Sequence, residues 1–243
     1  MRRDSGVTLL EVLIAVTMLS LLSVGMFLSM RIGLSAFART DARLMDNRRV
    51  AGAQRIIDQE LEGLLPAMAS CGMVESTPGP RAVMFQGLTD TLTMVSTYSL
   101  QEAWRGRPQL LQFFVAPSDD GGVRLLVNEM PYLGPISGGS LCRGVAVDTQ
   151  TGAPIPQFPR PAVGERSFVL ADRLAYCRFK YLTPSPKHGE PGSWLPAWTG
   201  IGWPSGIRVE MAPVNPSPGQ LQPITVTAPI YIFRNPEAQY ADR

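Results

Sequence analysis

The sequence predicts an α+β protein in which a long N-terminal helix is packed on an antiparallel β-sheet. Two observations predict this fold class. Residues 31–65 contain no proline and place apolar side chains at helical spacing. After residue 66, proline and glycine are spread between short runs of β-favouring residues. The 243 residues leave room for one folded domain of ordinary size beyond the helix.

The helix begins with an apolar run in which Glu11 is the only carboxylate. Residues 12–30 carry no charge, and at about 1.5 Å each they cross most of a hydrocarbon core about 30 Å thick. Arg2 and Arg3 precede the run, so the positive-inside bias places the first residues in the cytoplasm and the bulk of the chain outside. An ionisable side chain in a spanning helix costs about 2.5–3.5 kcal/mol on insertion scales. Glu11 therefore needs a partner or a task.

Two other kinds of N-terminal segment compete with this interpretation. A secretory signal peptide would find an A-x-A cleavage site at residues 36–38, but its apolar region would be about twice the usual 7–15 residues. A plain signal-anchor accounts for the apolar run and gives no reason for Glu11 or for the small residue that precedes the run.

Residues 6–15, GVTLLEVLIA, resemble the start of a type IV pilin or pseudopilin precursor. The resemblance implies that residues 1–6 are a leader, which an aspartyl prepilin peptidase removes by cutting between Gly6 and Val7. It also implies methylation of the new Val7 amine, retention of residues 7–30 as an inner-membrane helix, and assembly with other pilins or pseudopilins into a helical filament. The residue after the cut is commonly Phe in that family and is Val7 here.

The resemblance also gives Glu11 a task. Cleavage would create a positive amine on Val7, four residues before Glu11, on the same helix face and about 6 Å away along the axis. The carboxylate could neutralise that amine or, as the family implies, the amine of a neighbouring subunit, and low dielectric strengthens either pairing. Glu11 is then an assembly contact. The alternative is a carboxylate that reaches the inner headgroups.

The helix is expected to continue beyond the membrane, where residues 31–65 form a stalk. The whole helix would then have about 59 residues and a length of about 88 Å. Pro66 marks its end. Its apolar positions have the spacing of a helix with one buried face: Val50, Ala53, Ile57, Leu61, Leu64 and Leu65. A β-rich domain, residues 66–243, follows, with strands expected at residues 81–85, 91–98, 110–115, 123–128, 167–171, 174–182, 206–211 and 224–233, a hairpin loop at 116–122 and a long connection at 131–164.

Residues 174–211 are similar to the C-terminal sheet of J-type minor pseudopilins of type II secretion. The similarity lies in a strand ending in Phe179-x-Tyr181, a loop with Trp194 and Trp198, and a strand introduced by proline and small residues. It implies a minor subunit in the tip or initiation complex of a periplasmic pseudopilus. PilW-like minor pilins of a type IV or DNA-uptake pilus share the same features. Trp194, Trp198 and Trp203 either pack on a core face or contact a partner.

The three cysteines, Cys71, Cys142 and Cys177, lack the spacing of a zinc site or a CxxC pair. Outside the cytoplasm one disulfide is permitted and one thiol is left over. Cys177 alternates with Phe179 and Tyr181 in an expected strand, which predicts a buried core thiol. Cys71 and Cys142 are then the favoured pair, and three unpaired cysteines remain the alternative.

Other classes of protein find little support in the sequence. Lys and Arg total 22 against 20 Asp and Glu without a basic patch, so no nucleic acid partner is expected. No catalytic residue, metal or cofactor is expected either: the only histidine, His188, lies in a polar loop, and no hydrolase or phosphate-binding motif occurs. Asp119 and Asp120 precede two glycines without calcium-loop spacing and predict a turn. A membrane-anchored periplasmic hydrolase that uses carboxylates is the alternative from another class.

Overall fold

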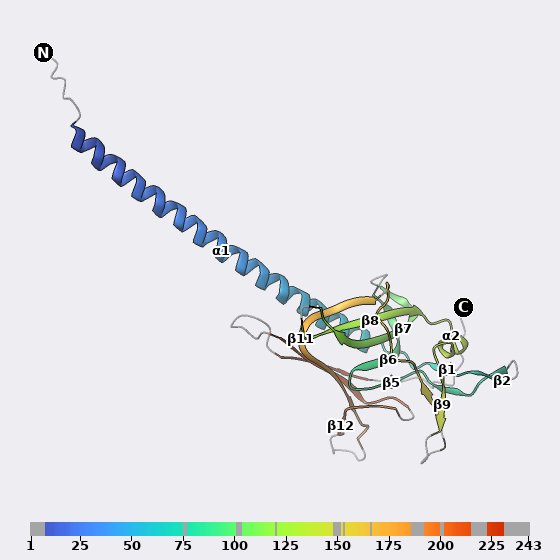
Figure 1. The fold of residues 1–243 in the computed structure, drawn as a ribbon. Helices are drawn as coiled ribbons and strands as arrows, with labels where there is room; N and C mark the ends of the chain where they lie inside the picture. Colours follow the sequence, from blue (N-terminus) through green and yellow to red (C-terminus); the bar gives the residue numbers. More distant parts are fainter. Residues whose placement is uncertain are drawn as a thin grey trace. The chain divides into compact units, whose positions relative to one another are not determined.

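In this computed structural model the described residues are 8–74, 77–100, 104–119, 121–147, 152, 154–165, 167–185, 192–199, 202–214 and 223–230. The helices are α1 (Leu9–Glu62) and α2 (Pro135–Gly139). The strands are β1 (Met68–Ser70), β2 (Met73–Val74), β3 (Thr77–Pro78), β4 (Arg81–Val83), β5 (Gln86–Gly87), β6 (Thr91–Ser99), β7 (Trp104–Pro117), β8 (Val123–Pro131), β9 (Gly144–Val147), β10 (Pro154–Gln157), β11 (Ser167–Leu182), β12 (Trp194–Leu195), β13 (Gly206–Pro213) and β14 (Ile224–Pro229). A long apolar helix followed by an antiparallel sheet confirms the predicted α+β class (Figure 1).

The chain divides into two units, Met1–Asn47 and Arg48–Arg243. In the first unit the described residues up to position 37 form a helix whose large apolar side chains are all exposed, with Leu9 at 87% and Met26 at 79%. The segment Leu9–Phe37 is long and apolar enough to cross a membrane by length and composition. The hydroxyls of Thr17 and Ser20 donate to backbone carbonyls three residues back, so these polar groups are satisfied within the helix.

The second unit is built on a sheet whose strands lie in the order β14-β13-β11-β8-β7-β6-β5, with β12 paired to β11. All neighbouring strands in it are antiparallel, as short hairpin connections such as that between β7 and β8 require. The C-terminal part of α1, from Ala53 to Glu62, packs on one face of this sheet. Ala53, Ile57 and Leu61 recur every four residues, so they share one side of the helix. Each is at most 2% exposed and belongs to the hydrophobic core between the helix and the sheet, which is called the main core below.

A smaller second core lies under the segments that surround α2. It contains Ala67, Ala69, Cys71, Ala82, Met84, Val95, Leu110 and Tyr132. Within residues 131–164, where the sequence predicted only a long connection, the structure has α2 and the hairpin β9–β10. Each of these elements has at most five residues, too few for a periodic pattern to appear, and α2 packs against β1.

The boundaries of several predicted elements also differ. The helix α1 ends at Glu62 and not at residue 65, because the chain joins the sheet: the Leu65 N–H donates to the Val95 carbonyl. The predicted strand 81–85 is shorter in the structure, where β4 ends at Val83 and the separate short strand β5 begins only at Gln86. The predicted strand 110–115 is part of the longer β7. The predicted strand 224–233 runs to residue 229 as β14, and residues 231–233 lie outside the described residues.

The predicted strands 167–171 and 174–182 form a single strand, β11, with an irregularity between them. Its first half pairs with β8 and its second half with β13. The register shifts between Ala171 and Leu174, where Arg173 has a φ of 53°. The extra residues bend the strand, and this bend allows one strand to pair with different neighbours along its length.

Candidate assembly site

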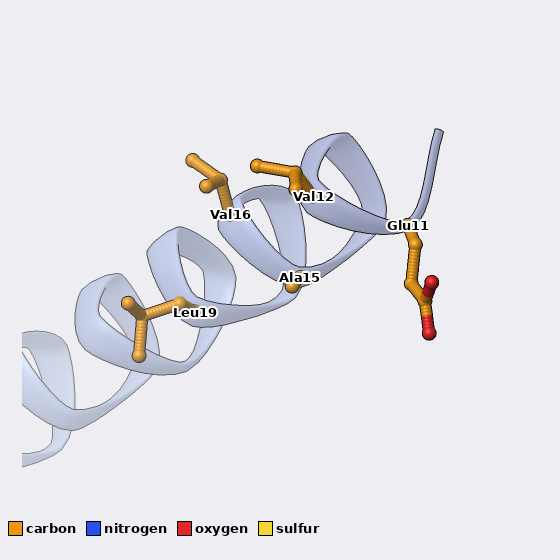
Figure 2. A pocket seen from close by; sticks show the side chains of 5 residues that line it. All are labelled: Glu11, Val12, Ala15, Val16 and Leu19. Atoms are coloured by element: carbon orange, nitrogen blue, oxygen red, sulfur yellow. The ribbon is translucent and has the colours of Figure 1, made fainter. Parts of the chain in front are cut away.

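The first described turn of α1 carries the carboxylate that the sequence singled out. Figure 2 shows Glu11, Val12, Ala15, Val16 and Leu19 along the helix, where their side chains line a shallow surface pocket. Glu11 is the only charged residue of the five, and the other four are apolar. The arrangement therefore places one anion at the end of an exposed apolar surface.

Thr8 and Glu11 together form the start of this helix. The Glu11 N–H donates to the Thr8 carbonyl at 3.1 Å and lies 3.3 Å from Thr8 Oγ1. This is the spacing of a capping box, and a carboxylate in the first turn also interacts favourably with the helix dipole. Thr8 was not among the site residues expected from the sequence, although the T-x-x-E spacing before an apolar run is the signal that identifies it. Thr8 therefore caps the helix through the Glu11 backbone N–H, and the Glu11 carboxylate contributes to the helix start through the dipole.

Gly6 and Val7, the expected cleavage and methylation residues, lie outside the described residues, as does His188. The leader and the junction therefore remain sequence-based expectations. The helix begins at Leu9, so the expected junction between residues 6 and 7 lies two residues before the helix in the sequence.

The structure joins Cys71 and Cys142 by a disulfide, with their Cα atoms 5.3 Å apart. Cys71 follows β1, and Cys142 follows α2, so the bond ties two sides of the second core together. Cys177 is a free thiol in the main core, on β11. Burial raises its pKa to about 12, so it is a protonated, unreactive thiol near neutral pH.

Two tryptophans of the loop that the sequence singled out, Trp198 and Trp203, pack against the main core. Trp198 exchanges two backbone hydrogen bonds with Gly87, and its indole Nε1 donates to the Gly202 carbonyl at 3.1 Å. Trp198 and Trp203 are partly buried against the main core. Gly87 is tightly enclosed, since a Cβ there would lie 2.2 Å from the Tyr181 ring. The sequence left open whether these tryptophans pack on a core face or contact a partner. For Trp198 and Trp203 the contacts favour packing on a core face.

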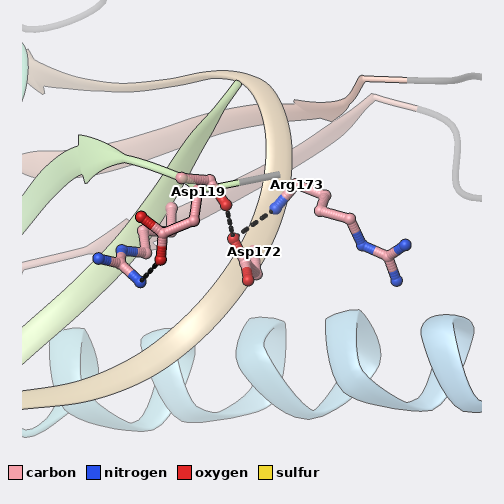
Figure 3. Close-up of polar contacts among 5 residues, drawn as sticks. Asp119, Asp172 and Arg173 are labelled. Atoms are coloured by element: carbon pink, nitrogen blue, oxygen red, sulfur yellow. Dashed lines mark hydrogen bonds and ion pairs between the residues drawn. The ribbon is translucent and has the colours of Figure 1, made fainter. Parts of the chain in front are cut away.

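The sequence predicted a turn at Asp119 and Asp120, and the structure has the turn between β7 and β8 there, with Asp120 outside the described residues. Ser118 Oγ donates to Asp172 Oδ1 at 2.6 Å, and the Arg173 backbone N–H donates to the same oxygen at 2.8 Å (Figure 3). The Ser118 hydrogen bond is the main cause that lowers the pKa of Asp172. Asp119 pairs with Arg124 at 3.7 Å. An ionised Asp172 that accepts two hydrogen bonds has no proton to give to a substrate. Its contacts with Ser118 and Arg173 hold the bend of β11 against the turn.

The comparisons with known proteins are consistent with the N-terminal features. Residues 1–27 match the family model of the prokaryotic N-terminal methylation motif. No curated protein matches the chain. The motif indicates a protein of the type IV pilin or pseudopilin type, a class that is typically structural, that assembles with other pilins and that prepilin peptidase processes. Together with the apolar helix, it indicates membrane anchoring with the rest of the chain outside.

Proposed function

We propose that this protein is a minor pseudopilin of a type II secretion system that acts in the tip or initiation complex of a periplasmic pseudopilus. The observation that carries the proposal is that the methylation motif over residues 1–27 overlaps the start of α1, whose large apolar side chains are all exposed from Leu9 to Phe37. Such a helix needs lipid before assembly and neighbouring helices after it. The similarity of residues 174–211 to J-type subunits supports the finer assignment.

Maturation in this proposal cuts the chain between Gly6 and Val7 and methylates the new amine. The domain organisation is then a leader of residues 1–6, a spanning helix of residues 7–30, a stalk of residues 31–65 and a β-rich domain of residues 66–243. Glu11 pairs with the Val7 amine of its own chain or of a neighbour. The partners are other major and minor pseudopilins and the prepilin peptidase at the inner membrane.

The intact mass of the protein extracted from the membrane tests the maturation step. The expected chain begins at methylated Val7. A chain that begins at Arg39 would show cleavage by signal peptidase, and an intact Met1 would show a plain anchor. Either result would contradict the proposal. A minor pilin of a type IV pilus shares the same maturation, and the subunits that co-purify after crosslinking in membranes distinguish the two machines.

Glu11→Gln is expected to weaken assembly without affecting cleavage or membrane insertion. The peptidase acts at Gly6, whereas the carboxylate is needed only once the Val7 amine is free. Leaving that amine without a counter-charge in a buried interface costs about 3–5 kcal/mol. The measurement is the amount of partner pseudopilin that co-purifies with processed protein. Glutamine retains the capping-box pattern, so this substitution removes the charge and keeps the cap.

Thr8→Val is the matched control, because it removes the side-chain cap and keeps the charge. Co-purification of partners should be close to wild type in Thr8→Val and clearly reduced in Glu11→Gln. If both variants lose partners equally, Glu11 acts through the helix start alone. If neither loses partners, Glu11 is a tolerated interfacial charge.

A further inference from the structure

The sheet face that lies opposite the helix carries a group of cationic and aromatic side chains on β11, β12 and β13. Inward residues such as Cys177 and Phe179 alternate along β11 with outward ones, and β13 alternates in the same way. The outward residues are Tyr176, Arg178 and Lys180 on β11, Trp194 on β12, and Arg208 and Glu210 on β13. We call these six residues the basic face.

The basic face has more positive than negative charge. Its only carboxylate, Glu210, accepts a hydrogen bond from Lys180 Nζ at 2.9 Å. Arg178 and Arg208 have no ion pair with any described residue. The Arg178 guanidinium lies 5.3 Å from the Tyr176 ring centroid, and the Arg208 guanidinium lies 4.0 Å from that of Trp194. Arg208 Nε also donates to Thr227 Oγ1 at 3.3 Å. The two guanidinium groups are therefore oriented by these contacts, and their remaining N–H groups can still donate to a ligand.

The strand register sets the separation of these two arginines. Arg178 lies opposite Glu210, and Lys180 lies opposite Arg208. Arg178 and Arg208 are therefore diagonal neighbours, whose backbones are about 7–8 Å apart. Their guanidinium groups diverge, because Arg178 lies against Tyr176, whereas Arg208 lies against Trp194, which pairs with the far end of β11. Alternate residues of an extended chain are separated by about 6.6–6.8 Å and point the same way. An extended segment with carboxylates at alternate positions would therefore present carboxylates along one face, where both arginines can bind them.

We propose that the basic face binds an extended acidic segment of a partner protein, with carboxylates at alternate positions that accept hydrogen bonds from Arg178 and Arg208. Carboxylates fit the planar donor pattern of arginine in a bidentate manner. A single-stranded nucleic acid fits less well, because base stacking needs open aromatic faces. Here the guanidinium groups cover one face of each ring, and Tyr176 and Trp194 are both partly buried.

The inference extends the proposed role in assembly, but it rests on the sheet alone and is tested in a binding assay that requires neither processing nor a filament. The full chain in detergent is titrated against a rhodamine-labelled peptide of alternating Glu and Thr, followed by fluorescence anisotropy. A peptide of alternating Gln and Thr is the matched control. Binding of the Glu peptide should exceed binding of the Gln peptide and weaken as ionic strength rises.

Three variants test which side chains are responsible. Arg178→Gln should weaken peptide binding about tenfold, the effect of losing one charge-assisted contact. Arg107→Gln changes an exposed arginine on β7 and should leave binding unchanged. Glu210→Gln removes the one carboxylate of the face and releases Lys180, so binding should become several times tighter. A gain in affinity cannot result from misfolding.

Several outcomes would overturn the proposal. The first is equal binding of the Glu and Gln peptides. The second is an equal effect of Arg178→Gln and Arg107→Gln. The third is a loss of affinity in a folded Glu210→Gln variant. Tighter binding of single-stranded oligo(dT) than of the Glu peptide would identify a nucleic acid surface, and tighter binding to micelles that contain phosphatidylglycerol would identify a lipid surface. A correctly processed, filament-forming protein that fails these tests would leave the proposed function intact.

Discussion

Replacing Cys71 and Cys142 together by alanine is expected to lower the free energy of unfolding of the second unit by about 4 kcal/mol from the lost cross-link alone. The magnitude follows from the sequence separation of 71 residues that the bond spans. In the chain-entropy model, closing a loop of that length removes about 15 cal/mol/K from the unfolded chain, or about 4.4 kcal/mol at 25 °C. Since a domain of this kind has about 5–15 kcal/mol of stability, the loss is a large fraction of the total.

Tryptophan fluorescence in urea measures this loss in the full chain. All four tryptophans lie between residues 104 and 203, after the start of the second unit. The signal therefore reports unfolding of the sheet domain and not of the apolar helix. With a urea dependence of about 2 kcal/mol per molar, a loss of about 4 kcal/mol lowers the midpoint by about 2 M.

Cys177→Ala provides the matched control, because Cys177 is also buried but forms no disulfide. It makes the same chemical change and should cost only about 1 kcal/mol, the effect of deleting one small buried group. A double variant that loses no more stability than two such deletions would refute the reasoning. So would wild-type protein whose midpoint stays the same after reduction.

Two further predictions follow from the burial of single side chains. Ile57→Ala should lower the free energy of unfolding by about 2–5 kcal/mol, because Ile57 is 1% exposed in the main core. Gln54→Ala changes an exposed residue one turn away and should have little effect. If Ile57→Ala and Gln54→Ala had the same urea midpoint, this part of α1 would not pack on the sheet. Burial raises the pKa of Cys177 to about 12. Below about pH 9 the thiol is protonated in both the folded and the unfolded chain, and between about pH 9 and 12 it ionises only when the chain unfolds, so the free energy of unfolding falls over that range. Cys177→Ala should therefore lose less stability than wild type over that range, and equal losses would contradict the assignment.

The regular elements of the second unit could be predicted because their patterns are local. Ile207, Val209 and Met211 are buried on β13, whereas Arg208 and Glu210 between them point outward. This period of two is visible in the sequence and fixes both the strand and its buried face. The helical spacing of Ala53, Ile57 and Leu61 was equally informative for the end of α1.

The remaining features depend on contacts between distant segments. The bend in β11 is held by Ser118, which lies 54 residues before Asp172, and no pattern within β11 indicates it. The second core gathers α2, β1 and β4 around a disulfide, and its elements are too short to have a period. The basic face was missed for the same reason. Arg178 and Arg208 are 30 residues apart in the sequence, and only the register of β11 with β13 makes them neighbours.

The helix α1 shows how one element can be suited to two environments. Over Leu9–Phe37 its large apolar side chains point in every direction, and none of the most apolar window is buried within the chain. From Ala53 to Leu61 its buried apolar residues fall on one side only. A helix that is apolar all round requires cover all round, whereas a one-sided helix requires a single packing surface. The sheet provides the second kind of cover, and nothing in the described chain provides the first. Lipid supplies such cover, and so do the neighbouring helices of the pilin-type assembly proposed above.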